Sequence, residues 1–164
     1  ERTQKIGFIL QEPILFSGTV KENILYGNEK YKDYSVVVFE KVLKDAGLDG
    51  LLVRFDGGLN AKVAMSDALS LGQKQLIAFM RAVLREPELL ILDEATANID
   101  TVTEQLLEDI LKKLPKETTR VIIAHRLNTI ENADEIFFVN GGSITMAGSM
   151  EHAVEMLLHG KRES

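Results

Sequence analysis

The chain has 164 residues, about the size of one domain, and its 25 Asp and Glu residues outnumber its 19 Lys and Arg residues, which gives a formal net charge of −6. This acidic balance argues against a protein whose main task is to hold nucleic acid phosphates. The absence of cysteine excludes disulfides, zinc–thiolate sites and cysteine nucleophiles. No apolar run is long enough to span a bilayer, so we expect a soluble domain or part of one.

Hydrophobic periodicity and turn residues predict strands that alternate with helices. In chain order, the predicted elements are a strand at 6–10, a short helix at 19–26, helices at 33–46 and 48–55, a loop at 57–67, a helix at 71–85, a strand at 89–92, a helix at 101–114, a strand at 121–124, a hairpin of strands at 135–139 and 143–146, and a helix at 149–158. This order is typical of an α/β sheet with parallel crossovers. The stretch 33–85 has almost no strand signal, so we expect a helical subdomain inserted between strands.

The sharpest local motif is Leu69-Ser70-Leu71-Gly72-Gln73, at the start of a predicted helix. Ser70 and Gln73 fit a capping box, in which each side chain accepts a hydrogen bond from the other residue's backbone N–H. Capping does not explain Gly72, which costs roughly 1 kcal/mol relative to Ala inside a helix. Glycine allows another group to approach the bare backbone, and a helix N-terminus is already an anion site. A cap alone and a phosphate contact both remain possible here.

Two acidic residues, Asp93 and Glu94, follow the predicted strand at 89–92. Side chains at the carboxyl end of a buried parallel strand face the crevice where α/β proteins bind ligands. Asp93 could contact a magnesium ion, and Glu94 could act on a water that attacks a phosphoryl group. The alternative is a pair of solvated acids at a strand end.

Three further polar residues occupy comparable positions. His125 and Gln11 follow the strands at 121–124 and 6–10, so both are expected at the same edge of the sheet. His125 could be functional or a structural histidine, and Gln11 could ligate a metal or simply leave the core. Asp100 is predicted to be the N-cap of the helix that begins at 101.

In this order, the motifs resemble those of the ATP-binding cassette (ABC) family. Gln11, LSLGQ at 69–73, LLILDE at 89–94, ANID at 97–100 and His125 are similar to the family's Q-loop, signature motif, Walker B motif, D-loop and switch histidine. The segments QEPILFSGTVKENILYG, DEATANIDTVTEQ and AHRLNTIENAD resemble the nucleotide-binding domains of ABC exporters in particular.

The resemblance implies a fold and a domain organisation. The expected fold class is α/β, a partial RecA-like P-loop NTPase sheet with an inserted α-helical subdomain. Residues 1–164 would be a single fragment of an ABC-type ATPase domain, with a helical subdomain at about 12–85 and an α/β core made of 1–11 and 86–164.

The resemblance also implies an activity, ATP hydrolysis coupled to the export of a substrate across a membrane. Two such domains sandwich two ATP molecules in this family, and each ATP lies between the Walker motifs of one domain and the signature helix of the other. Carried over, the roles are Glu94 as general base, His125 as a γ-phosphate contact, Asp93 and Gln11 as Mg²⁺-linked residues, Ser70, Gly72 and Gln73 as contacts to the partner's nucleotide, and Asp100 as a dimer-interface residue.

The implied cofactors are ATP and Mg²⁺, and the implied partners are a second nucleotide-binding domain, identical or different, and the transmembrane domain of the same transporter. No nucleic acid partner is expected. The parent protein would act at the cytoplasmic face of a membrane, and the fragment itself would be soluble.

Some family motifs have no counterpart in this sequence. No G-x-x-x-x-G-K-[ST] occurs, so the Lys and the backbone cradle that hold ATP phosphates are missing. The chain resembles the C-terminal two-thirds of a nucleotide-binding domain, and we expect it to be inactive alone. VAMSDA at 63–68 stands where exporters have a Gly-Glu-Gly-Gly-type segment, and Leu71 replaces the first Gly of the usual signature.

Two other functions compete with that of an exporter ATPase. A soluble, non-transport ABC ATPase of translation or DNA repair would be favoured by a basic surface or by coiled-coil heptads, and the sequence has neither. A non-catalytic regulatory domain would not require Glu94 and His125, which are both present.

Overall fold

The structure, a computed structural model, describes residues 5–64, 69–94, 98–124, 131–148 and 150–160. The chain divides into two units, of which the first ends at Ile123 and the second begins at Ala124. Each unit has its own cluster of buried apolar side chains.

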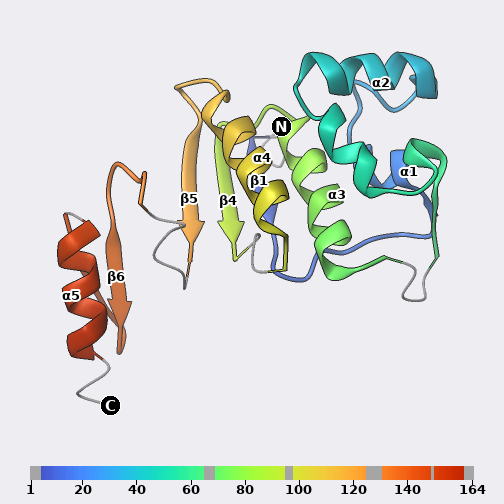
Figure 1. Cartoon of the computed structure of the whole chain (residues 1–164). Coiled ribbons are helices and arrows are strands. Elements are labelled where there is room, and N and C mark those ends of the chain that lie inside the picture. The colour runs from blue at the N-terminus through green and yellow to red at the C-terminus, as the bar shows by residue number, and fades with distance from the viewer. Residues whose placement is uncertain (1–4, 65–68, 95–97, 125–130, 149, 161–164) are drawn as a thin grey trace. The chain divides into compact units, whose positions relative to one another are not determined.

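The first unit is built on three parallel strands in the order β1 (Ile6–Ile9), β4 (Leu89–Asp93) and β5 (Thr119–Ile123). In their register Ile9 pairs with Leu92, which pairs with Ile122. Because all three run in the same direction, their carboxyl ends meet at one edge of the sheet, the lower edge in Figure 1. The predicted strands at 6–10, 89–92 and 121–124 and the predicted parallel sheet are confirmed.

Two helices, α3 (Leu71–Val83) and α4 (Thr101–Lys112), share a core with one face of this sheet. Phe79 of α3 and Leu107 of α4 are buried in the same cluster as Leu90 of β4. On the other face, Phe8 is 48% exposed and Val121 44% exposed. These exposed fractions show that the described part of this unit covers only one face of its sheet, whereas parallel sheets are normally covered on both faces.

The segment between β1 and α3 is mostly helical. It contains α1 (Val20–Ile24), α2 (Val36–Asp45) and the 3₁₀ helices η2 (Asp49–Arg54) and η3 (Gly58–Asn60). Ile24, Phe39 and Leu51 are fully buried and join the core cluster of α3. These elements confirm the helices predicted at 19–26, 33–46 and 48–55.

The loop predicted at 57–67 is wrong in part. Besides η3, this stretch contains β3 (Lys62–Val63), which pairs antiparallel with β2 (Gly18–Thr19). Strands of two residues carry no period-2 pattern, and the partner of Lys62 lies 43 residues earlier in the chain, at Thr19. Long-range pairing, which local patterns do not encode, decides the structure here.

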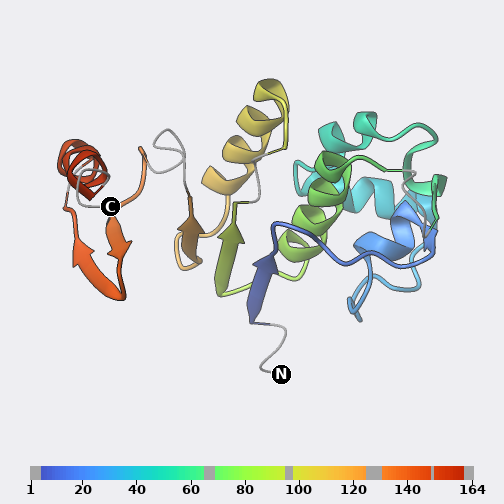
Figure 2. The same cartoon turned by 90° about the horizontal axis from the view of Figure 1, so that it is seen from below.

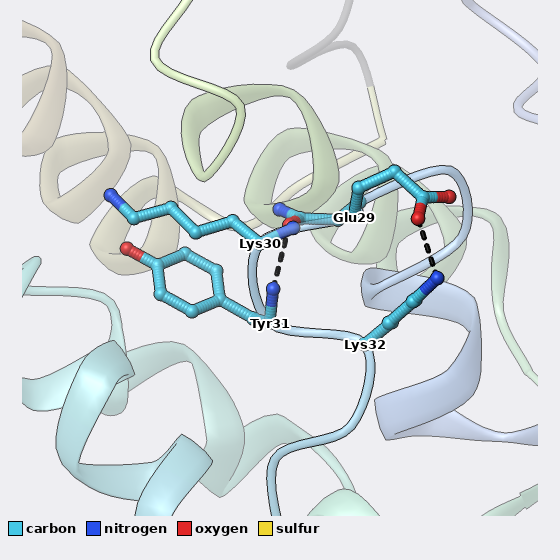
Figure 3. Close-up of polar contacts among 5 residues, drawn as sticks. Glu29, Lys30, Tyr31 and Lys32 are labelled. Carbon is cyan, nitrogen blue, oxygen red and sulfur yellow. Dashed lines mark hydrogen bonds and ion pairs between the residues drawn. The ribbon is translucent and has the colours of Figure 1, made fainter.

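The loop between α1 and α2 is held by its own side chains (Figure 3). The Asn28 side-chain oxygen accepts hydrogen bonds from the N–H groups of Lys30 and Tyr31, both at 3.1 Å. Lys32 forms an ion pair with Glu29, with 2.6 Å between Nζ and Oε2, and Lys30 lies along the Tyr31 ring. Exposed ion pairs of this kind contribute little to stability, so we assign this loop a local structural role.

The second unit contains a hairpin of β6 (Phe137–Asn140) and β7 (Ser143–Met146), followed by α5 (Met150–Gly160) (Figure 2). Gly141 and Gly142 form the turn with positive φ angles of 54° and 80°, as a two-residue hairpin of the I′ kind requires. The predicted hairpin and closing helix are therefore confirmed.

Candidate functional site

The carboxyl end of β4 carries the two candidate acids. Asp93 is the last residue of the strand and pairs with Ile123 of β5, and the Glu94 N–H donates to the Ile123 carbonyl at 3.0 Å. Glu94 has a φ of 46°, a left-handed conformation that is uncommon outside glycine and costs about 1–2 kcal/mol. Strained backbone of this kind clusters at functional sites. Among the described residues other than glycine, Glu86 (φ 51°) shares this conformation, but it precedes β4, so only Glu94 combines a left-handed φ with a position at the carboxyl end of a strand.

Gln11 lies two residues beyond the end of β1, and β1 is the strand next to β4 in the sheet. Gln11 is exposed, and its backbone carbonyl accepts a hydrogen bond from the Gln75 side-chain Nε2 at 3.1 Å. Asp93 ends β4, and Gln11 follows β1. Because β1 and β4 are parallel neighbours, both residues lie at the same edge of the sheet.

The chemistry of these two residues fits a magnesium ion. Carboxylate and amide oxygens suit Mg²⁺, which usually takes one or two carboxylates plus substrate phosphates. Within the described residues, no group of three or more His, Cys, Asp or Glu side chains could hold a metal ion. The donor set of Asp93 and Gln11 therefore fits a Mg²⁺ that phosphate oxygens also coordinate, and it does not fit a closed protein site.

The start of α3 has the predicted capping box. The Gln73 N–H donates to Ser70 Oγ at 3.1 Å, and the Ser70 N–H donates to Gln73 Oε1 at 2.9 Å. The Gln73 Nε2 also donates to the Arg54 carbonyl of η2 at 2.7 Å. The N–H groups of the first two helical residues, Leu71 and Gly72, have no acceptor within the helix. The capping interpretation is confirmed, and the helix start also keeps donors suited to an anion.

Gly72 is closely approached by a backbone group of this same chain. A Cβ added at this position would lie 2.7 Å from the carbonyl oxygen of Asn98, which precedes α4. No real Cβ tolerates that distance, so a side chain at position 72 would force the Asn98 segment to move. The sequence predicts a close approach of another group to the bare backbone here, and the structure shows that the Asn98 carbonyl of the same chain makes such an approach.

Asp100 caps α4, as predicted. Its carboxylate accepts from the Thr103 N–H at 3.0 Å and the Thr103 hydroxyl at 2.7 Å, and its Oδ1 lies 3.4 Å from Arg54 Nη2. These bonds from Thr103, followed by the charge of Arg54, hold the pKa of Asp100 below its usual value of 3.8. Arg54 therefore contacts the start of α3 and the start of α4. Its carbonyl accepts from Gln73, and its guanidinium donates to Asp100.

The lowered pKa of Asp100 has a testable consequence. We expect Asp100→Ala to lower the melting temperature at pH 7, because the cap is lost. A carboxyl group whose pKa is lower in the folded protein than in the unfolded protein stabilises the fold at pH values above its unfolded pKa. This stabilisation is lost as the pH falls through the pKa of the folded protein. The difference in melting temperature should therefore shrink below about pH 3.8. Asp100→Asn, which keeps a capping oxygen, is the control, and a difference that stays constant down to about pH 2.5 would contradict the assignment.

Gln75 is a site residue that the sequence did not indicate. It is 1% exposed, and its Oε1 has no hydrogen-bond partner among the described residues. A buried polar atom left unpaired costs about 1–3 kcal/mol. Gln75 follows Gln73 and Lys74 and directly precedes the apolar run 76–80 of α3, so hydrophobic patterning assigned the helix without marking this side chain as buried.

The structure thus brings together the carboxyl end of the sheet, the start of α3 and the start of α4 (Figure 1). His125 lies outside the described residues, so its predicted place at this edge stays a prediction. No helix in the described ranges is both long enough and apolar enough to cross a membrane.

Comparison with known proteins gives a family match over more than half of the chain. The model of the family described as "ABC transporter" matches residues 1–97. The "Uncharacterized ABC transporter ATP-binding protein YfiC" of Bacillus subtilis is 43% identical over 152 residues, 92% of this chain and 25% of that protein. The "Putative export ATP-binding/permease protein RT0691" of Rickettsia typhi is 40% identical over 145 residues, 88% of this chain and 25% of that protein. This chain therefore spans about a quarter of the length of these relatives.

A solved structure of a bacterial Atm1-family ABC exporter with ATP bound has a similar fold. The TM-score is 0.75 at 29% sequence identity, and the match covers 95% of this chain and 27% of that chain. The match confirms the predicted fold class, a partial RecA-like P-loop NTPase sheet with an inserted α-helical subdomain.

Proposed function

The chain belongs to the ABC transporter family, and from this premise we propose that it is part of the ATP-binding and ATP-hydrolysing module of an exporter. In the full-length exporter, hydrolysis is coupled to the movement of a substrate across a membrane, at whose cytoplasmic face the module acts. The observation that carries the proposal is Glu94, held with a φ of 46° at the carboxyl end of β4 beside Asp93. The names of the relatives, which include an export ATP-binding/permease protein, support an exporter over a soluble ATPase.

The proposed mechanism assigns one role to each residue at the sheet edge. Glu94 accepts a proton from the water that attacks the γ-phosphate of ATP, the task of a positioned general base. Asp93 and Gln11 hold Mg²⁺, which when bound neutralises charge on the phosphates. His125 contacts the γ-phosphate.

The start of α3 and the start of α4 are assigned to a second nucleotide-binding domain. Ser70, Gly72 and Gln73 contact the ATP held by that partner, where the free N–H groups of the first helical turn suit a phosphate. Asp100 lies at the interface between the two domains. The transmembrane domain of the same transporter is the other partner.

The domain organisation is proposed on the same basis. Residues 12–85 form the helical subdomain, and residues 1–11 with 86–164 belong to the α/β core. The helices α1, α2 and α3 and the two 3₁₀ helices all lie within 12–85, which supports this division.

The proposal is tested by ATP hydrolysis measured in two proteins under the same conditions. A full-length exporter that contains this sequence, in membrane vesicles, is expected to hydrolyse ATP with a requirement for Mg²⁺. Residues 1–164 alone are expected to be inactive, because their sequence holds no P-loop Lys or phosphate cradle. A full-length protein without Mg²⁺-dependent hydrolysis would refute the proposed activity. Mg²⁺-dependent hydrolysis by residues 1–164 alone would refute their predicted inactivity, and a dissociation constant for Mg·ATP below about 10 μM, near −7 kcal/mol, would mean that they hold the phosphates without a P-loop.

A further inference from the structure

A buried amide of α3 hydrogen-bonds the segment that follows β1, which Arg81 of the same helix also reaches by donating to the Ile14 carbonyl at 3.0 Å. Gln75 of α3 donates from Nε2 to the backbone carbonyl of Gln11, 64 residues earlier in the chain, at 3.1 Å. The Gln75 side chain is 1% exposed, and its Oε1 has no hydrogen-bond partner in the described parts of the chain. Through this bond α3 contacts the backbone of Gln11 directly.

The fold has little need of an amide at this position. The next two residues of α3, Leu76 and Ile77, are buried apolar residues of the core cluster. An apolar side chain of similar length would fill the same space without leaving an acceptor unpaired. Gln11 is exposed, so water could take over the bond to its carbonyl. Gln75 is thus unfavourable for packing, and yet it holds the backbone of Gln11. This combination indicates that Gln75 has a role in the candidate site at the sheet edge.

The helix connects this bond to the start of α3. Gln75 lies five residues after the cap Ser70, a rise of about 7.5 Å along a rigid helix. Movement of the Ser70–Gln73 turn therefore carries Gln75 with it, and through Gln75 the backbone of Gln11.

We propose that Gln75 is a positioning residue that holds Gln11 for its contact with Mg²⁺, and that it thereby links the metal contact of one ATP to the helix turn that touches the ATP of the partner domain. This inference rests on the proposed function, in which Gln11 is a metal contact. Gln75 does not itself touch the metal or the nucleotide.

The test measures metal binding in the absence of turnover. The protein is the full-length exporter with Glu94→Gln, loaded with ATP, and the probe is Mn²⁺ in place of Mg²⁺, with free Mn²⁺ followed by electron paramagnetic resonance. Gln75→Met is expected to raise the Mn²⁺ concentration at half-saturation about tenfold, the usual effect of removing a residue that orients a metal ligand. The affinity for ATP in the presence of EDTA should not change.

A double-mutant cycle separates positioning from a general structural role. Because Gln75 acts through Gln11, Gln75→Met is expected to have no further effect on Mn²⁺ binding in a Gln11→Ala background. Ile77→Val, a buried change on the same helix, is the control and should leave Mn²⁺ half-saturation unaltered. If Gln75→Met does not fold, Gln75→Asn gives the same test, because its amide is one methylene shorter and cannot keep the bond.

Two results would overturn the inference. One is an unchanged Mn²⁺ half-saturation in a folded Gln75 variant, and the other is an equal change whether Gln11 is present or has been replaced by the Gln11→Ala substitution. Failure of the parent Glu94→Gln protein to bind ATP and Mn²⁺ at all would instead overturn the proposed function, and the inference with it.

Discussion

Glu94→Gln in the full-length exporter is expected to lower ATP turnover by about 10²–10⁴-fold, the usual contribution of a positioned general base, while ATP binding is retained. The amide has the shape of the carboxylate but cannot accept the proton of the attacking water. The Glu94 backbone is fixed by its bond to Ile123 at 3.0 Å and by its left-handed φ, so the substitution should change the chemistry and not the geometry. Turnover and equilibrium ATP binding are the two measurements.

Glu88→Gln is the matched control for this prediction. Glu88 directly precedes β4, at the opposite end of the strand from Glu94, and forms an exposed ion pair with Lys5. Removal of that charge should leave turnover unchanged, since exposed ion pairs contribute little. Turnover of the Glu94→Gln protein within about threefold of the parent would exclude Glu94 as the base.

Gly72→Asp is expected to lower ATP turnover by at least about 10²-fold, and Gly72→Asn by about tenfold, or 1.4 kcal/mol in the barrier. Both side chains begin with a Cβ that would lie 2.7 Å from the Asn98 carbonyl, so both displace the segment before α4. Only Asp also adds a negative charge where the partner's phosphate is proposed to lie. Two like charges about 4 Å apart repel each other by several kcal/mol near a protein surface. This repulsion is the reason why turnover is expected to fall further in the Asp variant than in the Asn variant.

The comparison of Asp with Asn separates two reasons for the glycine. If position 72 faces a phosphate, the Asp variant is much the worse of the two, although both have similar melting temperatures. Equal turnover in the two variants would mean that glycine is needed only to accommodate Asn98.

The sequence predicted the elements whose signals are local. The strand at 89–92 is short and wholly apolar, and α3 follows the Ser70–Gln73 capping box, so both were predicted near their observed bounds. The Gly141-Gly142 turn likewise marked the hairpin of the second unit. Each of these depends on residues within a few positions of one another.

The missed features depend on residues far apart in the chain. The pairing of β2 with β3, the approach of Asn98 to Gly72, and the bond from Gln75 to Gln11 each bring distant segments together. Arg54 gave no signal at all, because one arginine in a short helix has no pattern that would place it between α3 and Asp100. Motif order therefore indicates the candidate site residues, whereas their contacts depend on the fold.

The most direct test of the account is a structure of the full-length Glu94→Gln exporter with Mg·ATP. We predict that the γ-phosphate lies one water molecule away from the residue 94 side chain of one nucleotide-binding domain and within hydrogen-bond distance of Ser70 of the other. A nucleotide that lies against residue 94 and Ser70 of the same domain, or against neither of them, would contradict this prediction.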